Sequence, residues 1–208
     1  MKGLLLKDWY MTVKYCRAYL LIAIVFIAVS FAGDGYLFFT FYPCLLCGMI
    51  PVNLLAYDER SRWIQYSETL PYSGAQIVSS KYLIGLFAQI TMLLVTSITQ
   101  GLRMRIGDTF RFDEFAMLML LMLIICTLSS SICLPFVFKL GVEKGRIAYY
   151  LMVGMVCAGS VIASSVFRGG LEMEVRPNAV LAIVAVAGIA LYALSWYLSV
   201  KFYQAREI

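Results

Sequence analysis

The stretch FAMLMLLMLIICTLSSSICLPFVF, residues 115–138, contains no charged residue. Apolar residues fill it almost continuously and do not recur at the period of one helix face or one strand, so the segment has to be solvated by lipid. A helix needs about 20 such residues to cross the hydrocarbon core of a bilayer. This stretch therefore predicts a transmembrane helix and an all-α membrane fold.

Similar stretches occur on both sides of it. The predicted spans are residues 18–32, 36–57, 82–102, 115–138, 147–167 and 177–200. The first span is short, and its tight Gly33-Asp34-Gly35 link makes it either one arm of a helical hairpin or a re-entrant segment. Of the 208 residues, 62% are hydrophobic and only 14% are charged, against about half and a quarter in soluble domains. We expect one polytopic domain of six transmembrane helices over residues 1–208.

The distribution of basic residues predicts the orientation. With a cytoplasmic N-terminus, twelve of the 17 Lys and Arg residues fall on inner segments. The positive-inside rule then places both termini in the cytoplasm. Arg103, Arg105 and Arg111 oppose this prediction, because they lie on an outer loop. The net charge of +5 therefore reflects topology, and we expect no nucleic-acid partner.

Residues 1–17 have a helical pattern of their own and lack the features of a cleavable signal peptide. Leu5, Trp9 and Val13 recur four residues apart, whereas Lys7 and Asp8 lie on the other side. The pattern predicts an amphipathic helix that lies on the inner leaflet. An ordinary basic anchor without a mechanical role explains the pattern equally well.

Several kinds of chemistry are missing from the sequence. It contains no histidine and no P-loop motif, which excludes zincin sites, Ser-His pairs and nucleotide binding through a P-loop. No charged residue falls inside the six predicted spans, which disfavours a proton-coupled transporter. The six cysteines are best explained as reduced packing residues. We therefore expect no enzyme activity, no metal site and no cofactor held by this chain.

The loop after the second span has an ordered pattern. Asp58 suits a helix N-cap, and Trp63, Tyr66 and Leu70 share one face of a short helix that Pro71 ends. Ser73 and Gln76 then form a capping box that starts the helix into the third span. The pattern predicts a cytoplasmic helix over residues 58–71. The pattern alone is as consistent with a helix resting in the headgroups as with a docking lever.

Specific residues in this loop carry a family resemblance. Asp58-Glu59-Arg60-Ser61, Trp63, Thr69–Ser73 and Ile77–Leu83 resemble the cytoplasmic loop of ABC-2 type permeases of bacterial exporters, and Lys2–Asp8 is similar to the start of those permeases. Gly74 departs from the family, in which many members carry Arg or Lys at this position. Within that family, the chain resembles the permeases of phenol-soluble modulin and antimicrobial-peptide exporters.

The resemblance implies a role for the loop and a set of partners. It implies that Glu59–Leu70 acts as a coupling helix on a separate ATP-binding subunit, which binds ATP and Mg²⁺. The residues expected at that contact are Asp58, Glu59, Arg60, Arg62, Trp63, Tyr66 and Leu70. A second permease, identical or homologous, would complete the exporter in the bacterial plasma membrane.

Other features leave alternatives open. Gly154, Ala158, Gly159 and Ala163 form a small-residue face for close helix packing, either within the bundle or against a second permease. The apolar spans with hydroxyl groups suit an amphipathic or hydrophobic substrate, and they suit general helix packing as well. The rival functions are a secondary transporter or channel without nucleotide dependence, a membrane enzyme and a membrane scaffold.

Overall fold

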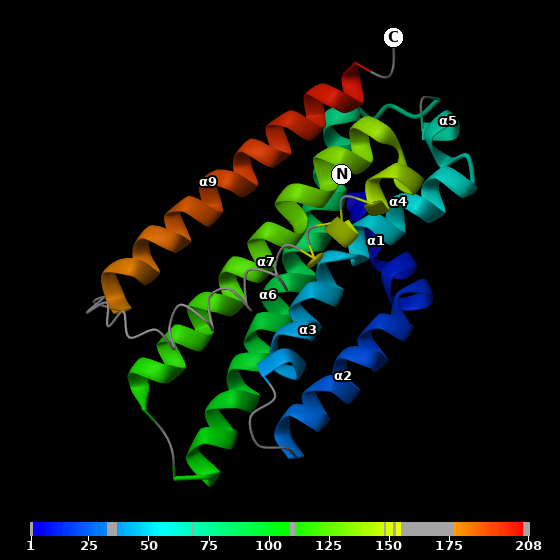
Figure 1. The fold of residues 1–208 in the computed structure, drawn as a ribbon. Helices are drawn as coiled ribbons and strands as arrows, with labels where there is room; N and C mark the ends of the chain where they lie inside the picture. Colours follow the sequence, from blue (N-terminus) through cyan, green and yellow to red (C-terminus); the bar gives the residue numbers. More distant parts are fainter. Residues whose placement is uncertain are drawn as a thin grey trace.

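The computed structural model describes residues 2–32, 37–67, 69–108, 111–147, 149–151, 153–154 and 177–205. Within these residues all regular structure is helical, as predicted (Figure 1). The helices are α1 (Lys2–Tyr15), α2 (Arg17–Ala32), α3 (Leu37–Gly48), α4 (Ile50–Arg60), α5 (Trp63–Ser67), α6 (Gly74–Ile106), α7 (Phe112–Leu140) and α9 (Pro177–Gln204). Residues 142–147 are helical as well.

Four helical segments of the described chain are long and apolar enough to cross a membrane. They are Thr40–Arg60, Gly74–Ile106, Phe115–Leu140 and Ala185–Gln204. The pair α1 and α2 adds a fifth if the two helices, which meet at a 60° bend, count as one broken span. Most of the predicted span 147–167 lies outside the described residues, so the number six stays a prediction.

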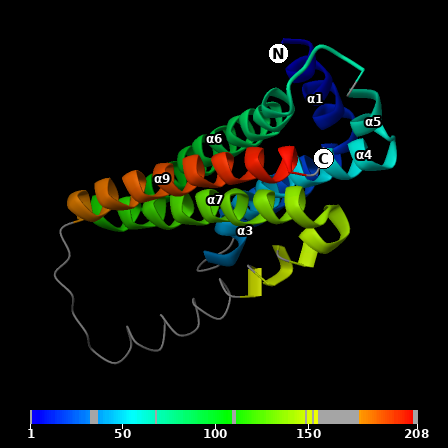
Figure 2. The same cartoon turned by 90° about the horizontal axis from the view of Figure 1, so that it is seen from above.

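The long helices α6, α7 and α9 run side by side, and α3 packs on α2, α6 and α7 (Figures 1 and 2). The C-terminal end of α9 and the loop that contains α5 lie at one end of this bundle, and the turn between α6 and α7 lies at the other (Figure 1). We call the first the loop end and the second the turn end. α6 has 33 residues, which at about 1.5 Å each exceed the roughly 30 Å of a hydrocarbon core. An α6 that crosses upright therefore extends beyond that core.

The predicted second span is broken into α3 and α4. Gly48 ends α3, and Pro51 lies in the first turn of α4, where the N–H that proline lacks would have no helical partner. A Cβ atom added to Gly48 would lie 1.8 Å from Ser129 Oγ of α7. Only glycine thus allows α3 and α7 to approach this closely at the break.

The N-terminal helix forms as predicted, but the surroundings of its polar side differ from the prediction. Leu4, Asp8 and Thr12 make up its buried face, whereas Trp9 and Val13 are exposed. Part of the polar side, at Asp8 and Thr12, therefore packs against protein, whereas Lys14 remains exposed. Periodicity separates the two faces of a helix, but it does not reveal that α4 and α6 supply charges complementary to one of them.

The loop after α4 also differs from the prediction. Asp58 lies in the last turn of α4 and is not an N-cap, because the helix of the second span continues to Arg60. The chain then turns at Arg62, which has a φ of 53°, and α5 is a single short helix of five residues. The predicted capping box is confirmed: the Ser73 N–H donates to Gln76 Oε1 at 3.4 Å, and α6 begins at Gly74.

Candidate functional site

Four charged side chains meet where α1, α4 and α6 come together. They are Lys7 and Asp8 of α1, Asp58 of α4 and Lys81 of α6, and we call them the charge cluster. Lys81 Nζ lies 2.6 Å from Asp8 Oδ1 and 2.5 Å from Asp58 Oδ2. Lys7 Nζ lies 2.7 Å from Asp58 Oδ1 and 3.4 Å from Asp8 Oδ1. Each ammonium group therefore bridges both carboxylates.

The charge cluster is electrically neutral, and three of its four residues are buried; the Lys7 side chain is 23% exposed. Asp8, Asp58 and Lys81 are 0%, 2% and 1% exposed. Burying an isolated charge costs several kcal/mol, and only close pairing with full hydrogen bonding offsets that cost. Burial lowers the pKa of the Lys7 ammonium group and the Lys81 charge acts in the same direction, whereas Asp58 and Asp8 act to raise it.

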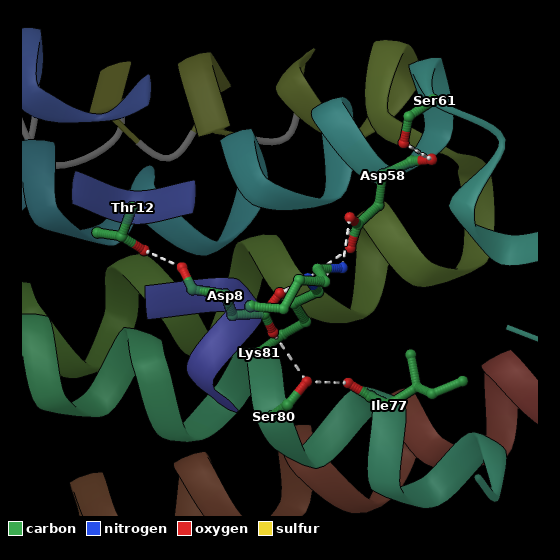
Figure 3. A network of polar contacts seen from close by, with 8 residues as sticks. Asp8, Thr12, Asp58, Ser61, Ile77, Ser80 and Lys81 are labelled. Atoms are coloured by element: carbon green, nitrogen blue, oxygen red, sulfur yellow. Dashed lines mark hydrogen bonds and ion pairs between the residues drawn. The ribbon is translucent and has the colours of Figure 1, made fainter. Parts of the chain in front are cut away.

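Neighbouring polar groups complete the charge cluster (Figure 3). The Ser80 hydroxyl lies 2.9 Å from Asp8 Oδ2 and 2.8 Å from the Ile77 carbonyl oxygen, two acceptors for its single hydrogen. The Thr12 hydroxyl donates to the Asp8 carbonyl oxygen at 2.8 Å, and the Ser61 hydroxyl donates to the Asp58 carbonyl oxygen at 3.2 Å. These hydrogen bonds involve backbone groups of the helix segments that carry Asp8, Asp58 and Lys81.

The charge cluster joins the two helices on either side of α5. Asp58 is the third residue from the end of α4, and Lys81 lies in the second turn of α6. Asp8 brings α1 into contact with Lys81 over 73 positions of sequence. The cluster therefore links α1, α4 and α6 at the base of the loop.

The residues that the sequence predicts for ATPase coupling divide by exposure. Glu59, Arg60, Arg62 and Tyr66 are exposed, whereas Trp63 and Leu70 are half-buried and Asp58 is buried in the charge cluster. The Trp63 ring faces inward, with Lys7 Nζ 4.0 Å from its centroid. The predicted common face of Trp63, Tyr66 and Leu70 is thus divided between the interior and the surface.

A small cavity of about 350 Å³ lies between α1 and this loop. Its lining residues are Gly3, Leu4, Lys7, Trp63, Tyr66, Leu70 and Tyr72. Elsewhere at the loop end, Glu59 Oε2 accepts a hydrogen bond of 3.2 Å from the backbone N–H of Val142, which follows α7. The loop end therefore combines exposed charged side chains, exposed Tyr66 and a shallow hollow.

The predicted small-residue face falls mostly outside the described residues. Ala158, Gly159 and Ala163 belong to that part of the chain. Gly154 is exposed, and a Cβ added to it would meet no atom within 4 Å. Among the described residues, no three His, Cys, Asp or Glu side chains gather as a metal site would require.

Sequence reasoning missed the charge cluster. The sequence places Lys81 one residue before the predicted third span, and the structure shows it inside α6 and fully enclosed. A clue was present: all four cluster residues stand in the two segments that carry the family resemblance, Lys2–Asp8 and Asp58–Leu83. The structure shows that these two segments are in contact.

Comparison with known proteins identifies a family for nearly the whole chain. No curated protein and no solved structure matches the chain. The family description "ABC-2 family transporter protein" matches residues 3–204, which include every helix named above almost to its ends. The chain, an apolar helical membrane protein whose loop end carries a buried junction of charges, therefore belongs to the ABC-2 transporter family.

Proposed function

We propose that this chain is the permease subunit of an ATP-driven exporter and is driven through its loop end by a separate ATPase. Membership of the ABC-2 family supports the first half, since such permeases are membrane components of ABC transporters and imply an ATP-binding partner. The sequence lacks a P-loop, so ATP and Mg²⁺ would be held by that partner.

The charge cluster is the observation that supports coupling most directly. A partner that pushes on exposed Arg62 or Tyr66 acts on a loop whose two ends are joined by ion pairs at Asp58 and Lys81. Such a junction resists bending, so displacement of the loop is passed on to α4 and α6 as whole helices. We assign docking to the exposed Glu59, Arg60, Arg62 and Tyr66, and rigidity to Asp58 and Trp63.

The remaining parts of the proposal concern membrane and substrate. Basic residues of α1, of the loop and of residues 139–146 gather at the loop end, which supports a cytoplasmic location for that end in a bacterial plasma membrane. Exposed apolar side chains along α2, α6 and α9 need lipid or a second permease, identical or homologous. The substrate we propose is an amphipathic or hydrophobic molecule, such as a toxin or antimicrobial peptide.

The test replaces exposed loop residues and leaves the interior intact. In the double variant Arg62→Asn/Tyr66→Ala, asparagine is chosen because it tolerates the positive φ of this position. The matched control, Arg105→Asn/Ile106→Ala, removes an exposed arginine and an exposed apolar side chain at the turn end. Both variants should insert into the membrane like the wild type.

We expect the loop variant to lose co-purification with the ATPase, or to lose ATPase stimulation in the assembled complex, and the control to retain both. Wild-type coupling in the loop variant would contradict the proposal. Transport by the purified chain alone in liposomes, without nucleotide, would support a secondary transporter or channel in its place.

A further inference from the structure

Three buried polar side chains meet towards the turn end, where α2, α3 and α6 come together. Gln100 of α6 donates from Nε2 to Ser30 Oγ of α2 at 2.8 Å and to Thr40 Oγ1 of α3 at 3.0 Å. The two hydroxyl groups lie 2.8 Å apart and share a further hydrogen bond. Gln100, Ser30 and Thr40 are 5%, 2% and 3% exposed. We call these three residues the polar triad.

The polar triad uses both N–H groups of the Gln100 amide. A primary amide carries two donor hydrogens, and Ser30 and Thr40 each accept one of them. A displacement of α6 that broke these bonds would leave the amide without partners in a buried place, which destabilises the protein. It therefore costs less free energy for α2 and α3 to follow α6 than to separate from it.

The helices α2 and α3 also pack on each other beside the polar triad. The rings of Phe26 on α2 and Tyr42 on α3 stack with centroids 4.4 Å apart. Phe26 lies about one helical turn before Ser30. The hydrogen bond between Ser30 and Thr40 joins the same two helices. A force that acts on either helix at this level is thus shared by both.

The helix α6 connects the polar triad with the charge cluster. Gln100 follows Lys81 by about five turns on one continuous helix without proline, a distance of about 28 Å along the axis. This is close to the roughly 30 Å of a hydrocarbon core. The other two helices of the charge cluster end sooner, because α4 begins only after the break at Gly48 and α1 meets α2 at a 60° bend. Of these three helices, α6 is therefore suited to carry a displacement across the membrane.

We propose that Gln100 is the positioning residue through which α6 moves α2 and α3 at the turn end when the ATPase displaces the loop end. The inference rests on the proposed function, because the ATPase supplies the displacement. α6 transmits it as a continuous helix, and the two hydrogen bonds of Gln100 make α2 and α3 follow. Three helices then shift together at the turn end in each ATP cycle.

The chain offers Gln89 as a matched control for Gln100. Gln89 is on the same helix, is 6% exposed, and its Nε2 lies 2.6 Å from Ser130 Oγ of α7. Gln89→Met and Gln100→Met each remove one paired buried amide and keep an unbranched side chain. In Gln100→Met the Ser30 and Thr40 hydroxyl groups still bond to each other. Both variants should therefore fold and should lower the thermal midpoint by similar amounts.

The experiment measures nucleotide-dependent shifts at the turn end in the permease–ATPase complex in lipid nanodiscs. Spin labels are attached to exposed positions in a Cys157→Ser background, in which the five remaining cysteines are buried. The pair Val29→Cys/Val186→Cys gives the distance from α2 to α9, and the pair Leu102→Cys/Val186→Cys gives the distance from α6 to α9. Each distance is measured without nucleotide and after trapping with ATP, Mg²⁺ and vanadate.

We expect both distances to change with nucleotide in the wild type. In Gln100→Met the α6 distance should still change, whereas the α2 distance should stay at its nucleotide-free value. Thr40→Val keeps the side-chain shape and removes one acceptor, so it should reduce the α2 shift in part. Gln89→Met should shift like the wild type. A merely structural role of Gln100 would lower the thermal midpoint without separating the two distances.

Three outcomes would overturn the inference: a constant α2 distance in the wild type, an α2 shift of wild-type size in Gln100→Met, or an equal loss of the α2 shift in Gln89→Met. The α6 distance tests the proposed function separately, because it should stay constant in the loop variant Arg62→Asn/Tyr66→Ala. A constant α6 distance in the wild type would contradict both the coupling and the inference. A normal α6 shift with an unaffected α2 shift in Gln100→Met would contradict the inference alone.

Discussion

At the scale of single residues, Lys81 shows how a full charge is held in the first turns of a membrane helix. Its ammonium group contacts Asp8 and Asp58 and is shielded from water almost completely. The charge remains acceptable because the four-residue cluster has no net charge and its carboxylates accept further hydrogen bonds. Replacement of one charged residue of the cluster should therefore destabilise the protein more than simultaneous replacement of one lysine and one aspartate.

Asp8→Asn should destabilise the protein by about 3–5 kcal/mol, because it leaves an excess buried cation. The measurement is thermal or denaturant unfolding in detergent. Asp113→Asn, the same change at an exposed site, should stay within about 0.5 kcal/mol. The neutral double variant Asp8→Asn/Lys81→Met should recover part of the loss. Equal stability of both single variants would argue against an energetic role for the charge cluster.

Gly48→Ala should destabilise the protein by about 1–3 kcal/mol, since the new methyl group would overlap Ser129 Oγ and Cβ, at 1.8 Å and 2.7 Å. Ser129→Gly in the same chain removes both atoms and should restore part of the stability. Gly154→Ala is the control, because its added Cβ meets nothing within 4 Å. The measurement is a double-mutant cycle of unfolding free energies. If the effects of the two substitutions at positions 48 and 129 simply add, the close contact is refuted.

At the scale of helices, hydroxyl groups connect α6 with α9. The Tyr82 hydroxyl lies 2.7 Å from Ser195 Oγ and 2.6 Å from Ser199 Oγ, and the Tyr192 hydroxyl donates to the Tyr82 carbonyl oxygen at 2.8 Å. Lipid tails are as apolar as the helix side chains, so the hydrophobic effect does not drive such helices together. Side-chain packing and hydrogen bonds stabilise their contact instead. The Tyr82 ring also stacks on Trp196, with centroids 5.5 Å apart.

Tyr82→Phe keeps the ring contacts and removes only the hydroxyl. We expect a loss of about 1 kcal/mol, because each interhelical hydrogen bond in a membrane contributes on average about 0.6 kcal/mol. Tyr197→Phe is the control, since Tyr197 is on the same helix but 69% exposed. The readout is the unfolding midpoint in detergent. A midpoint shift of the same size in both variants would indicate that the Tyr82 hydroxyl has no special role.

At the scale of the whole molecule, basic residues are distributed unequally between the two ends. Lys7, Arg62 and Lys144 belong to the loop end, whereas Arg103 and Arg105 lie at the last turn of α6. The predicted orientation with both termini in the cytoplasm places Arg62 inside and Arg105 outside.

Single cysteines at these two positions test the orientation. In a Cys157→Ser background, the other five cysteines are buried, so an impermeant maleimide should label only the introduced thiol. Intact cells should show labelling of Arg105→Cys, and Arg62→Cys should react only after the membrane is opened. The reverse pattern would turn the loop end outward and contradict the coupling proposal.

Local features of the sequence determined much of this protein. The apolar runs 82–102, 115–138 and 177–200 predicted the long helices α6, α7 and α9, because crossing a bilayer requires about 20 consecutive apolar residues. Ser73 and Gln76 fixed the start of α6 through a contact three residues apart. The alternation of faces in residues 2–15 likewise predicted α1.

Only the tertiary structure decided what those faces contact. Asp8 and Lys81 are 73 positions apart, and Lys7 and Asp58 are 51 apart, so no local pattern pairs them. The same folding turned the predicted N-cap Asp58 into an interior group. The physical reason is that periodicity assigns a residue to one side of its own helix, whereas ion pairing and burial depend on which other helices arrive on that side.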